Sequence, residues 1–159
     1  MKKHALEDRD FASWVFIART RDAIFRNRVK ELQKHNLSVR QASVLIVLEE
    51  LDTKATPAEV SKWVFREPHS VSDFLKRMER DGLIKRIKDL KRKNMIRIEV
   101  TDKGREAVHN AKKIEPVHKI MAVLSNEEHR QLMAIMQKLW DKALEELRIE
   151  NRPIFPSFQ

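Results

Sequence analysis

The fold is decided by residues 56–104, which have the sequence TPAEVSKWVFREPHSVSDFLKRMERDGLIKRIKDLKRKNMIRIEVTDKG. At the start of this segment, Thr56 can cap a helix, Pro57 suits the first helical position, and Glu59 is placed to close a capping box with Thr56. The segment therefore predicts a short helix that ends at about Val64.

A second helix is expected directly after the first. Pro68 again suits a first helical position, and Gly82 suits the left-handed residue that commonly ends a helix. Between them, apolar residues recur at helical spacing and predict one buried stripe: Val71, Phe74, Leu75 and Met78. The pattern predicts two short helices that meet across a tight turn.

The period of the apolar residues changes after this helix pair. Residues 95–100 alternate between apolar and polar, which predicts a β-strand, and residues 83–89 are its expected antiparallel partner. Residues 90–94 would form the tip of the hairpin. One face of the second strand carries its apolar side chains: Ile96, Ile98 and Val100.

Positive charge is concentrated in this predicted hairpin. Residues 83–97 hold a single acid, Asp89, and seven basic residues: Lys85, Arg86, Lys88, Lys91, Arg92, Lys93 and Arg97. A run of charge is commonly no more than a solvated surface, but flanking apolar residues indicate an ordered hairpin here. The hairpin is therefore expected to contact nucleic acid.

Helices are expected on both sides of the hairpin module. Residues 8–35 have apolar side chains mostly three or four positions apart, which predicts a long amphipathic helix. Ser38 and Gln41 form a capping box for a second helix that is apolar nearly all round and therefore central. After the hairpin, Thr101 is expected to cap a further helix, interrupted near Pro116.

The last long helix is expected to begin at the capping box formed by Ser125 and Glu128. One side of it is apolar: Leu132, Ile135, Met136, Leu139, Ala143 and Leu147. Residues 151–159, NRPIFPSFQ, cannot continue this helix because of their prolines. The sequence as a whole predicts a mainly α-helical protein with a small β-hairpin.

The composition excludes several classes of protein. The 159 residues include two glycines and no cysteine, and their formal net charge is +9. Glycine-rich phosphate loops, disulfides, thiolate nucleophiles and Cys-ligated metals are therefore not expected, and the charge favours an anionic partner. The charged beginning, MKKHALEDRD, and the short apolar runs favour a cytoplasmic protein without a membrane span.

Neither a catalytic nor a metal site is expected. Carboxylates are scattered beside Lys and Arg on helix faces, whereas a hydrolase or transferase needs a nucleophile with a base or paired carboxylates in a cleft. The six histidines do not have the spacing of a metal-binding motif. We therefore expect no enzyme, no metal and no other cofactor.

Several short stretches occur in a fixed order along the chain: TPAEV at 56–60, VS at 71–72 followed by Leu75, MERDGLI at 78–84, VTDKG at 100–104 and LSNEE at 124–128. Their order and spacing resemble the MarR (multiple antibiotic resistance regulator) family of winged helix–turn–helix transcription regulators. The resemblance spans roughly residues 10–148, which is nearly the whole chain.

The resemblance implies a homodimer that binds double-stranded DNA at a pseudo-palindromic operator, usually as a repressor relieved by a small-molecule effector. Residues 1–37 and 105–150 would form the helical dimerisation region. Residues 38–104 would form the winged helix–turn–helix module, with the wing at about 83–100, and 151–159 would be a C-terminal tail.

The resemblance also places the DNA-binding side chains. The recognition helix would be about 68–81, with five residues off its buried stripe and able to face the major groove: His69, Ser70, Ser72, Asp73 and Lys76. The tip of the wing would supply three cations: Lys91, Arg92 and Lys93. Hydroxyls and ammonium groups suit phosphates and purine edges.

Three features depart from the family pattern. Phe65 stands in the turn between the two short helices, where family sequences often have glycine. Arg92 and Asn94 occupy the places of an Asp and an Arg that brace the family's wing. Asp73 stands where a basic residue is common, and a carboxylate near phosphates is unfavourable unless it accepts from a cytosine amino group.

Two alternatives of other classes stay open. The hairpin of a winged-helix protein–protein interaction module would dock an acidic protein surface, and an architectural DNA binder would tolerate any sequence.

Without cysteine, a peroxide switch is not expected, so the expected regulatory ligand is a small organic effector, and the basic surface favours an anion. Aromatic residues at helical spacing usually belong to a core, but four could line the effector pocket: Phe11, Trp14, Trp63 and Phe65.

Overall fold

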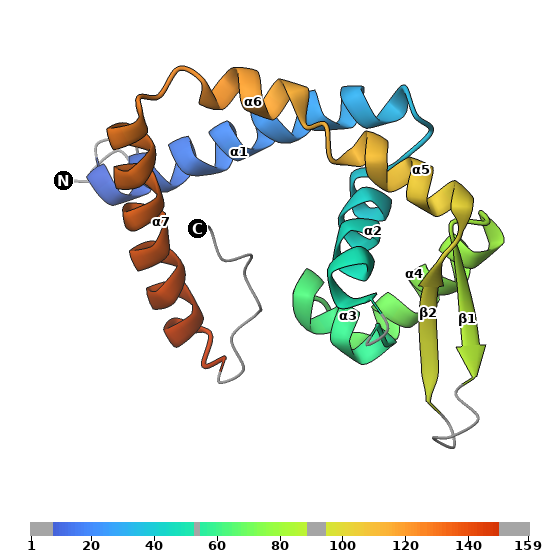
Figure 1. The fold of residues 1–159 in the computed structure, drawn as a ribbon. Coiled ribbons are helices and arrows are strands. Elements are labelled where there is room, and N and C mark those ends of the chain that lie inside the picture. Colours follow the sequence, from blue (N-terminus) through green and yellow to red (C-terminus); the bar gives the residue numbers. More distant parts are fainter. Residues whose placement is uncertain (1–7, 53–54, 89–94, 150–159) are drawn as a thin grey trace.

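The computed structural model describes residues 8–52, 55–88 and 95–149. These residues form helices and one two-stranded antiparallel sheet, in the order shown in Figure 1. The elements are α1 (Arg9–Gln33), α2 (Val39–Leu51), α3 (Pro57–Val64), α4 (Pro68–Arg80), β1 (Ile84–Lys88), β2 (Ile96–Val100), α5 (Asp102–Ala111), α6 (Glu115–Met121) and α7 (Asn126–Glu146). The predicted fold class, mainly α with a small β-wing, is confirmed.

The helix starts follow the capping residues in the sequence. The Ser38 hydroxyl accepts from the Gln41 N–H, and the Gln41 side chain accepts from the Ser38 N–H at 2.9 Å, so the predicted capping box is present. Thr56 caps α3 through the Glu59 N–H, as expected. The prediction that Glu59 closes this box is wrong, because its carboxylate pairs with Lys62 at 2.7 Å.

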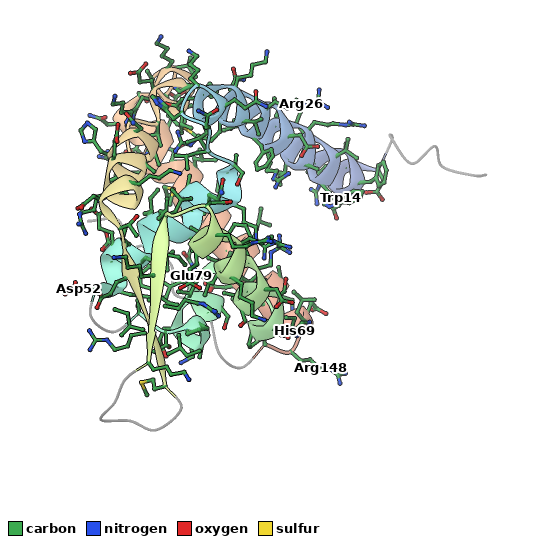
Figure 2. All side chains as sticks on the ribbon, turned by 90° about the vertical axis from the view of Figure 1, so that its right-hand side faces the viewer. Trp14, Arg26, Asp52, His69, Glu79 and Arg148 are labelled. Atoms are coloured by element: carbon green, nitrogen blue, oxygen red, sulfur yellow. The ribbon has the colours of Figure 1, made fainter. Side chains whose placement is uncertain are left out.

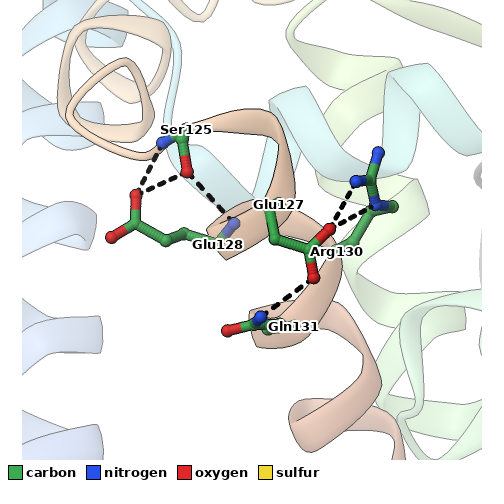
Figure 3. Close-up of polar contacts among 5 residues, drawn as sticks. All are labelled: Ser125, Glu127, Glu128, Arg130 and Gln131. Atoms are coloured by element: carbon green, nitrogen blue, oxygen red, sulfur yellow. Dashed lines mark hydrogen bonds and ion pairs between the residues drawn. The ribbon is translucent and has the colours of Figure 1, made fainter.

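The start of α7 is the second predicted capping box, and Figure 3 shows its contacts. The Glu128 carboxylate accepts from the Ser125 N–H at 2.8 Å, and the Ser125 hydroxyl accepts from the Glu128 N–H. In the same turn, the Glu127 carboxylate accepts from Arg130 and from the Gln131 side chain. The two hydrogen bonds between Ser125 and Glu128 satisfy backbone N–H groups that a helix start leaves without partners.

The winged module is built around α2, which packs against α1, α3, α5 and β2. Its core combines the predicted stripe of α4 with the inner faces of α2 and the hairpin, and the largest fully buried side chains include Leu45, Leu48, Leu75, Met78 and Ile84. The hairpin pairs Ile84 with Val100 at its base and Lys88 with Ile96 at its outer end. Gly82, at φ 73°, ends the α4 segment in the left-handed conformation that the sequence predicted.

The second part of the molecule is a helical arm. In Figure 1, α1 and α6 lie alongside each other, and α7 turns away from the end of this pair. The helix expected to be interrupted near Pro116 is divided into α5 and α6 by residues 112–114, and Pro116 lies in the first turn of α6. No described helix combines the length and the apolar character required to cross a bilayer.

The arm exposes a large apolar surface in this single chain. Trp14 is 63% exposed and lies toward the outer end of α1 (Figure 2), and none of the described elements packs along α7 as α6 packs along α1. Several other large side chains of α1 and α7 are also exposed: Phe16, Ile17, Ile135, Met136 and Leu139. Such a surface is typical of a protein interface.

Candidate nucleic-acid interface

The helix α4 presents one buried and one open face. Its buried side chains are the four predicted ones, Val71, Phe74, Leu75 and Met78. On the open side, His69, Asp73 and Lys76 are exposed, and His69 lies in the first turn (Figure 2). Ser70 and Ser72 are half-buried, so the five predicted recognition residues differ in how far they reach solvent.

Two of these residues neutralise each other. Lys76 Nζ lies 2.8 Å from Asp73 Oδ1, one helical turn away. This hydrogen bond, more than the nearby charges of Arg77 and His69, lowers the pKa of Asp73 below its ordinary value. Asp73 thus pairs with the Lys76 ammonium group, which would otherwise be free to bind a phosphate. An exposed ion pair of this kind is weak and can separate on DNA.

Ser70 is held by an arginine of the neighbouring helix α2. Arg40, in the first turn of α2, donates from Nη2 to the Ser70 carbonyl oxygen at 3.3 Å and to its hydroxyl at 3.4 Å. Both bonds are long and therefore weak. They nevertheless connect the first turn of α4 to α2.

The base of the wing is fixed by Glu79. Its carboxylate accepts from both the Arg86 N–H and the Arg86 side chain at 2.8 Å, which ties β1 to the last turns of α4. These two hydrogen bonds lower the pKa of Glu79. Sequence reasoning missed this brace, although an acid and an arginine flanking the Gly82 turn were a usable signal. The predicted tip residues Lys91, Arg92 and Lys93, like Asn94, lie outside the described residues.

The turn between α3 and α4 holds Phe65 at φ 50° and ψ 55°. This left-handed conformation is the one that glycine adopts without cost, which explains why the equivalent family position is often glycine. The Phe65 ring meets the ring of Trp140 on α7 nearly edge to face, with centroids 5.9 Å apart. The turn therefore keeps its geometry without glycine and gains an aromatic contact with the arm.

A cavity of about 520 Å³ lies directly behind the start of α4. Side chains from α1, α2, the α3–α4 turn and α4 line it, among them Arg21, Phe25, Arg40, Arg66 and Phe74. The four predicted aromatics do not line this cavity: Phe11 packs on Trp14 on the outer half of α1, and Phe65 packs on Trp140.

The cavity is electropositive and partly aromatic. The Arg40 guanidinium stacks on the Phe74 ring at 4.1 Å, and Arg21 stacks on Phe25 at 4.6 Å. Burial, followed by the charges of Arg77 and Arg66, lowers the pKa of Arg40. Within the described part of the chain, no carboxylate forms an ion pair with Arg40, Arg66 or Arg77. Such a cavity suits an anion that carries an aromatic ring.

Comparison with known proteins decides the family. Family models and curated proteins gave no match to the sequence. Among solved structures, the organohalide-sensing transcriptional regulator RdhR, in its 2,4-dichlorophenol-bound form, is similar over 96% of this chain and 91% of its own, with 30% identity and a TM-score of 0.85. The chain belongs to the MarR family.

Two more distant MarR-like structures support the fold. The MepR–DNA complex from S. aureus matches 86% of this chain and 99% of its own, with 23% identity and a TM-score of 0.72. A MarR-family regulator from Streptomyces coelicolor matches 86% and 96%, with 19% identity and a TM-score of 0.71. This MarR-family chain is a DNA-binding transcription regulator, in which α3 and α4 form the helix–turn–helix and β1 and β2 the wing.

Histidine, aspartate and glutamate do not gather into a metal site in this MarR-family structure. Within residues 8–52, 55–88 and 95–149, no group of three such side chains is placed to hold a metal ion.

Proposed function

We propose that the protein is a homodimeric, ligand-responsive repressor that binds a pseudo-palindromic operator. In this proposal α4 enters the major groove with His69, Ser70, Ser72, Asp73 and Lys76 toward the DNA. The wing tip, Lys91, Arg92 and Lys93, contacts phosphates or the minor groove. The exposed side of α4, opposite a fully buried stripe, supports this orientation.

The exposed arm supports the homodimer. Apolar side chains on α1 and α7 lie uncovered in one chain, and Leu139 and Ile135 are about half exposed. A second copy would cover them by placing its own α1 and α7 against them, which is the self-complementary arrangement of a two-fold dimer. In this arrangement residues 1–37 and 105–150 supply the dimerisation region, and 38–104 the DNA-binding module.

The cavity behind α4 is the proposed effector site. Two of its arginines, Arg40 and Arg66, pair with no carboxylate of the described residues, and together with the Phe74 surface they favour a small aromatic anion, such as a phenolate or an aromatic carboxylate. RdhR, with 30% identity to this chain, was crystallised with 2,4-dichlorophenol, a weakly acidic phenol. This similarity supports the same chemical class of effector.

The observation that carries the proposal is the position of Arg40. It lines the cavity, stacks on Phe74 and donates to Ser70 in the first turn of α4. An anion that pairs with Arg40 would compete with Ser70 for its Nη2 group. Effector binding would thereby release the start of the recognition helix and shift the protein from the DNA-binding to the released conformation.

Fluorescence anisotropy tests this proposal. An operator would first be selected from a random duplex library, and 2,4-dichlorophenol and benzoate would then be titrated against the complex. We expect one of them to weaken operator binding in the parent protein and to have a much smaller effect on Arg40→Gln. Arg26→Gln is the matched control, because Arg26 is an exposed arginine of α1 outside the cavity (Figure 2). Equal responses of the two variants would contradict the role of Arg40.

A further inference from the structure

The break between α5 and α6 lies between the winged module and the helical arm. The helix α5 packs against α2 and β2 of the winged module, whereas α6 packs along α1 of the arm. The residues between them are 112–114, and Ile114 has φ 38° and ψ 34°. A left-handed conformation is unfavourable for a β-branched residue, so other contacts must hold the break in this shape.

Those contacts come from one ion pair on α1. Arg28 donates to the Ala111 carbonyl oxygen at the end of α5 and forms an ion pair with Glu31. The Glu31 carboxylate in turn accepts from the Glu115 N–H, the first residue of α6, at 3.0 Å. Both side chains are about nine-tenths buried.

Each member of this pair meets the helix end that suits its charge. A helix leaves carbonyl oxygens without partners at its C-terminus and N–H groups without partners at its N-terminus. Arg28 places a cation at the C-terminus of α5, and Glu31 places an anion at the N-terminus of α6. Both charges are also favourable for the helix dipoles. The residue before α6, Ile114, makes no side-chain cap of its own, so Glu31 supplies that contact.

A buried ion pair of this kind is poorly explained by stability alone. Removing two charges from water costs free energy that their attraction often fails to recover, and an apolar pair of similar volume is frequently as stable or more stable. Arg28 and Glu31 do what an apolar pair could not, since they form directional hydrogen bonds to two helix ends. We therefore expect the pair to fix the angle between the end of α5 and the start of α6.

We infer that Arg28 and Glu31 are positioning residues that fix the winged module relative to the arm, and thereby set the separation of the two recognition helices in the dimer. The effect on the separation of the recognition helices rests on the proposed function, because it assumes a dimer on an operator. The position of the winged module relative to the arm is a property of one chain and can be tested without DNA.

The test measures the distance between module and arm by double electron–electron resonance. The chain has no cysteine, so two can be introduced for spin labels at Arg80 on α4 and Lys119 on α6, both exposed. Labelled chains would be mixed with an excess of unlabelled protein, so that only the distance within one chain is observed. The parent should give one narrow distribution.

Two double variants separate positioning from simple ion pairing. Arg28→Met with Glu31→Leu keeps a packed, uncharged pair, and Arg28→Glu with Glu31→Arg restores the ion pair with each charge at the wrong helix end. We expect both to broaden the distribution and shift its maximum, while the circular dichroism spectrum stays that of the parent. If one variant fails to fold, the other still gives the measurement.

The matched control is Glu49→Gln. Glu49 on α2 pairs with Lys112, the residue directly after α5, so this ion pair joins the end of α5 to the winged module and not to α1 or α6, and its loss should leave the distribution unchanged. Parent-like distributions in the folded double variants, or a charge swap that restores the parent's distance, would overturn the inference. A protein that showed the expected shifts but bound no DNA would instead refute the proposed function.

Discussion

Gly104 offers a sharp test of how closely the wing and α5 approach each other. It lies in the first turn of α5, where its N–H donates to the Thr101 hydroxyl at 3.0 Å. A Cβ at this position would lie 2.1 Å from the Leu83 carbonyl oxygen and 2.6 Å from Val100 Cγ1. To reach 3.0 Å, the shortest separation that real Cβ atoms show, the carbonyl would have to retreat by about 0.9 Å.

The expected cost of Gly104→Ala follows from two opposing effects. Alanine is favoured over glycine within a helix by about 1 kcal/mol. Overpacking typically costs about 1–3 kcal/mol, and the upper end applies because the obstructing atom belongs to the backbone, which cannot rotate away. We therefore expect a net loss of about 2 kcal/mol or more in the free energy of unfolding.

Gly82→Ala is the matched control in the same module. A Cβ at Gly82 would meet nothing closer than Lys103 Cδ at 3.9 Å, so only the left-handed backbone, φ 73°, opposes it. Its expected cost is about 1 kcal/mol, since the left-handed penalty is partly offset by a less flexible unfolded chain. Urea denaturation at fixed protein concentration, followed by tryptophan fluorescence, measures both. A Gly104→Ala protein that is as stable as the parent, or less affected than Gly82→Ala, would refute the close approach.

Three further variants address the wing and the recognition helix. Glu79→Gln should lower the free energy of unfolding by about 0.5–1 kcal/mol near neutral pH. Because the folded pKa of Glu79 is depressed, its stabilisation is present above the unfolded pKa, about 4.3, and is lost as pH falls through the folded pKa. Urea titrations at several pH values should therefore show the difference between parent and variant shrinking in acid, and a constant difference would contradict this assignment. Asp73→Asn should strengthen binding to any duplex several-fold in anisotropy measurements, since it removes a carboxylate and frees Lys76; weaker binding would mean that this carboxylate contacts a base. Ser72→Ala should cost about 1–3 kcal/mol on the operator and little on random DNA, and equal losses on both would exclude a base contact.

The order of the elements could be predicted because its signals are local. Ser38 with Gln41, Thr56 with Pro57, and Ser125 with Glu128 each fix a helix start within four residues of sequence. Alternation in residues 95–100 likewise predicted the strand that the structure shows. These features need no knowledge of distant parts of the chain.

The shape of the break after α5 could not be predicted from local patterns. Pro116 indicated an interruption, but the contacts that hold it come from Arg28 and Glu31, more than 80 residues earlier. An arginine and a glutamate three positions apart on a helix look like an ordinary surface pair. Only the packing of α6 against α1 shows that they are buried.

The cavity behind α4 could not be predicted from the aromatic residues of the sequence, because none of the four that we singled out lines it. Trp14 and Phe11 lie on the outer half of α1, and Phe65 lies in the α3–α4 turn, where its ring packs against Trp140. The arginines that line the cavity instead belong to α1, α2 and the α3–α4 turn. These arginines are brought together by the tertiary fold, so their spacing in the sequence does not predict the cavity.

The most direct test of the central claim is the ratio of two affinities, measured by anisotropy at one fixed salt concentration. The protein would be titrated with the operator selected from the random library and with a scrambled duplex of the same length and composition. A sequence-specific regulator should bind the operator at least about 10³-fold more tightly, with both affinities falling as salt is raised. Equal affinities for the two duplexes would indicate an architectural DNA binder, and no salt-sensitive binding to either would indicate a protein interaction module.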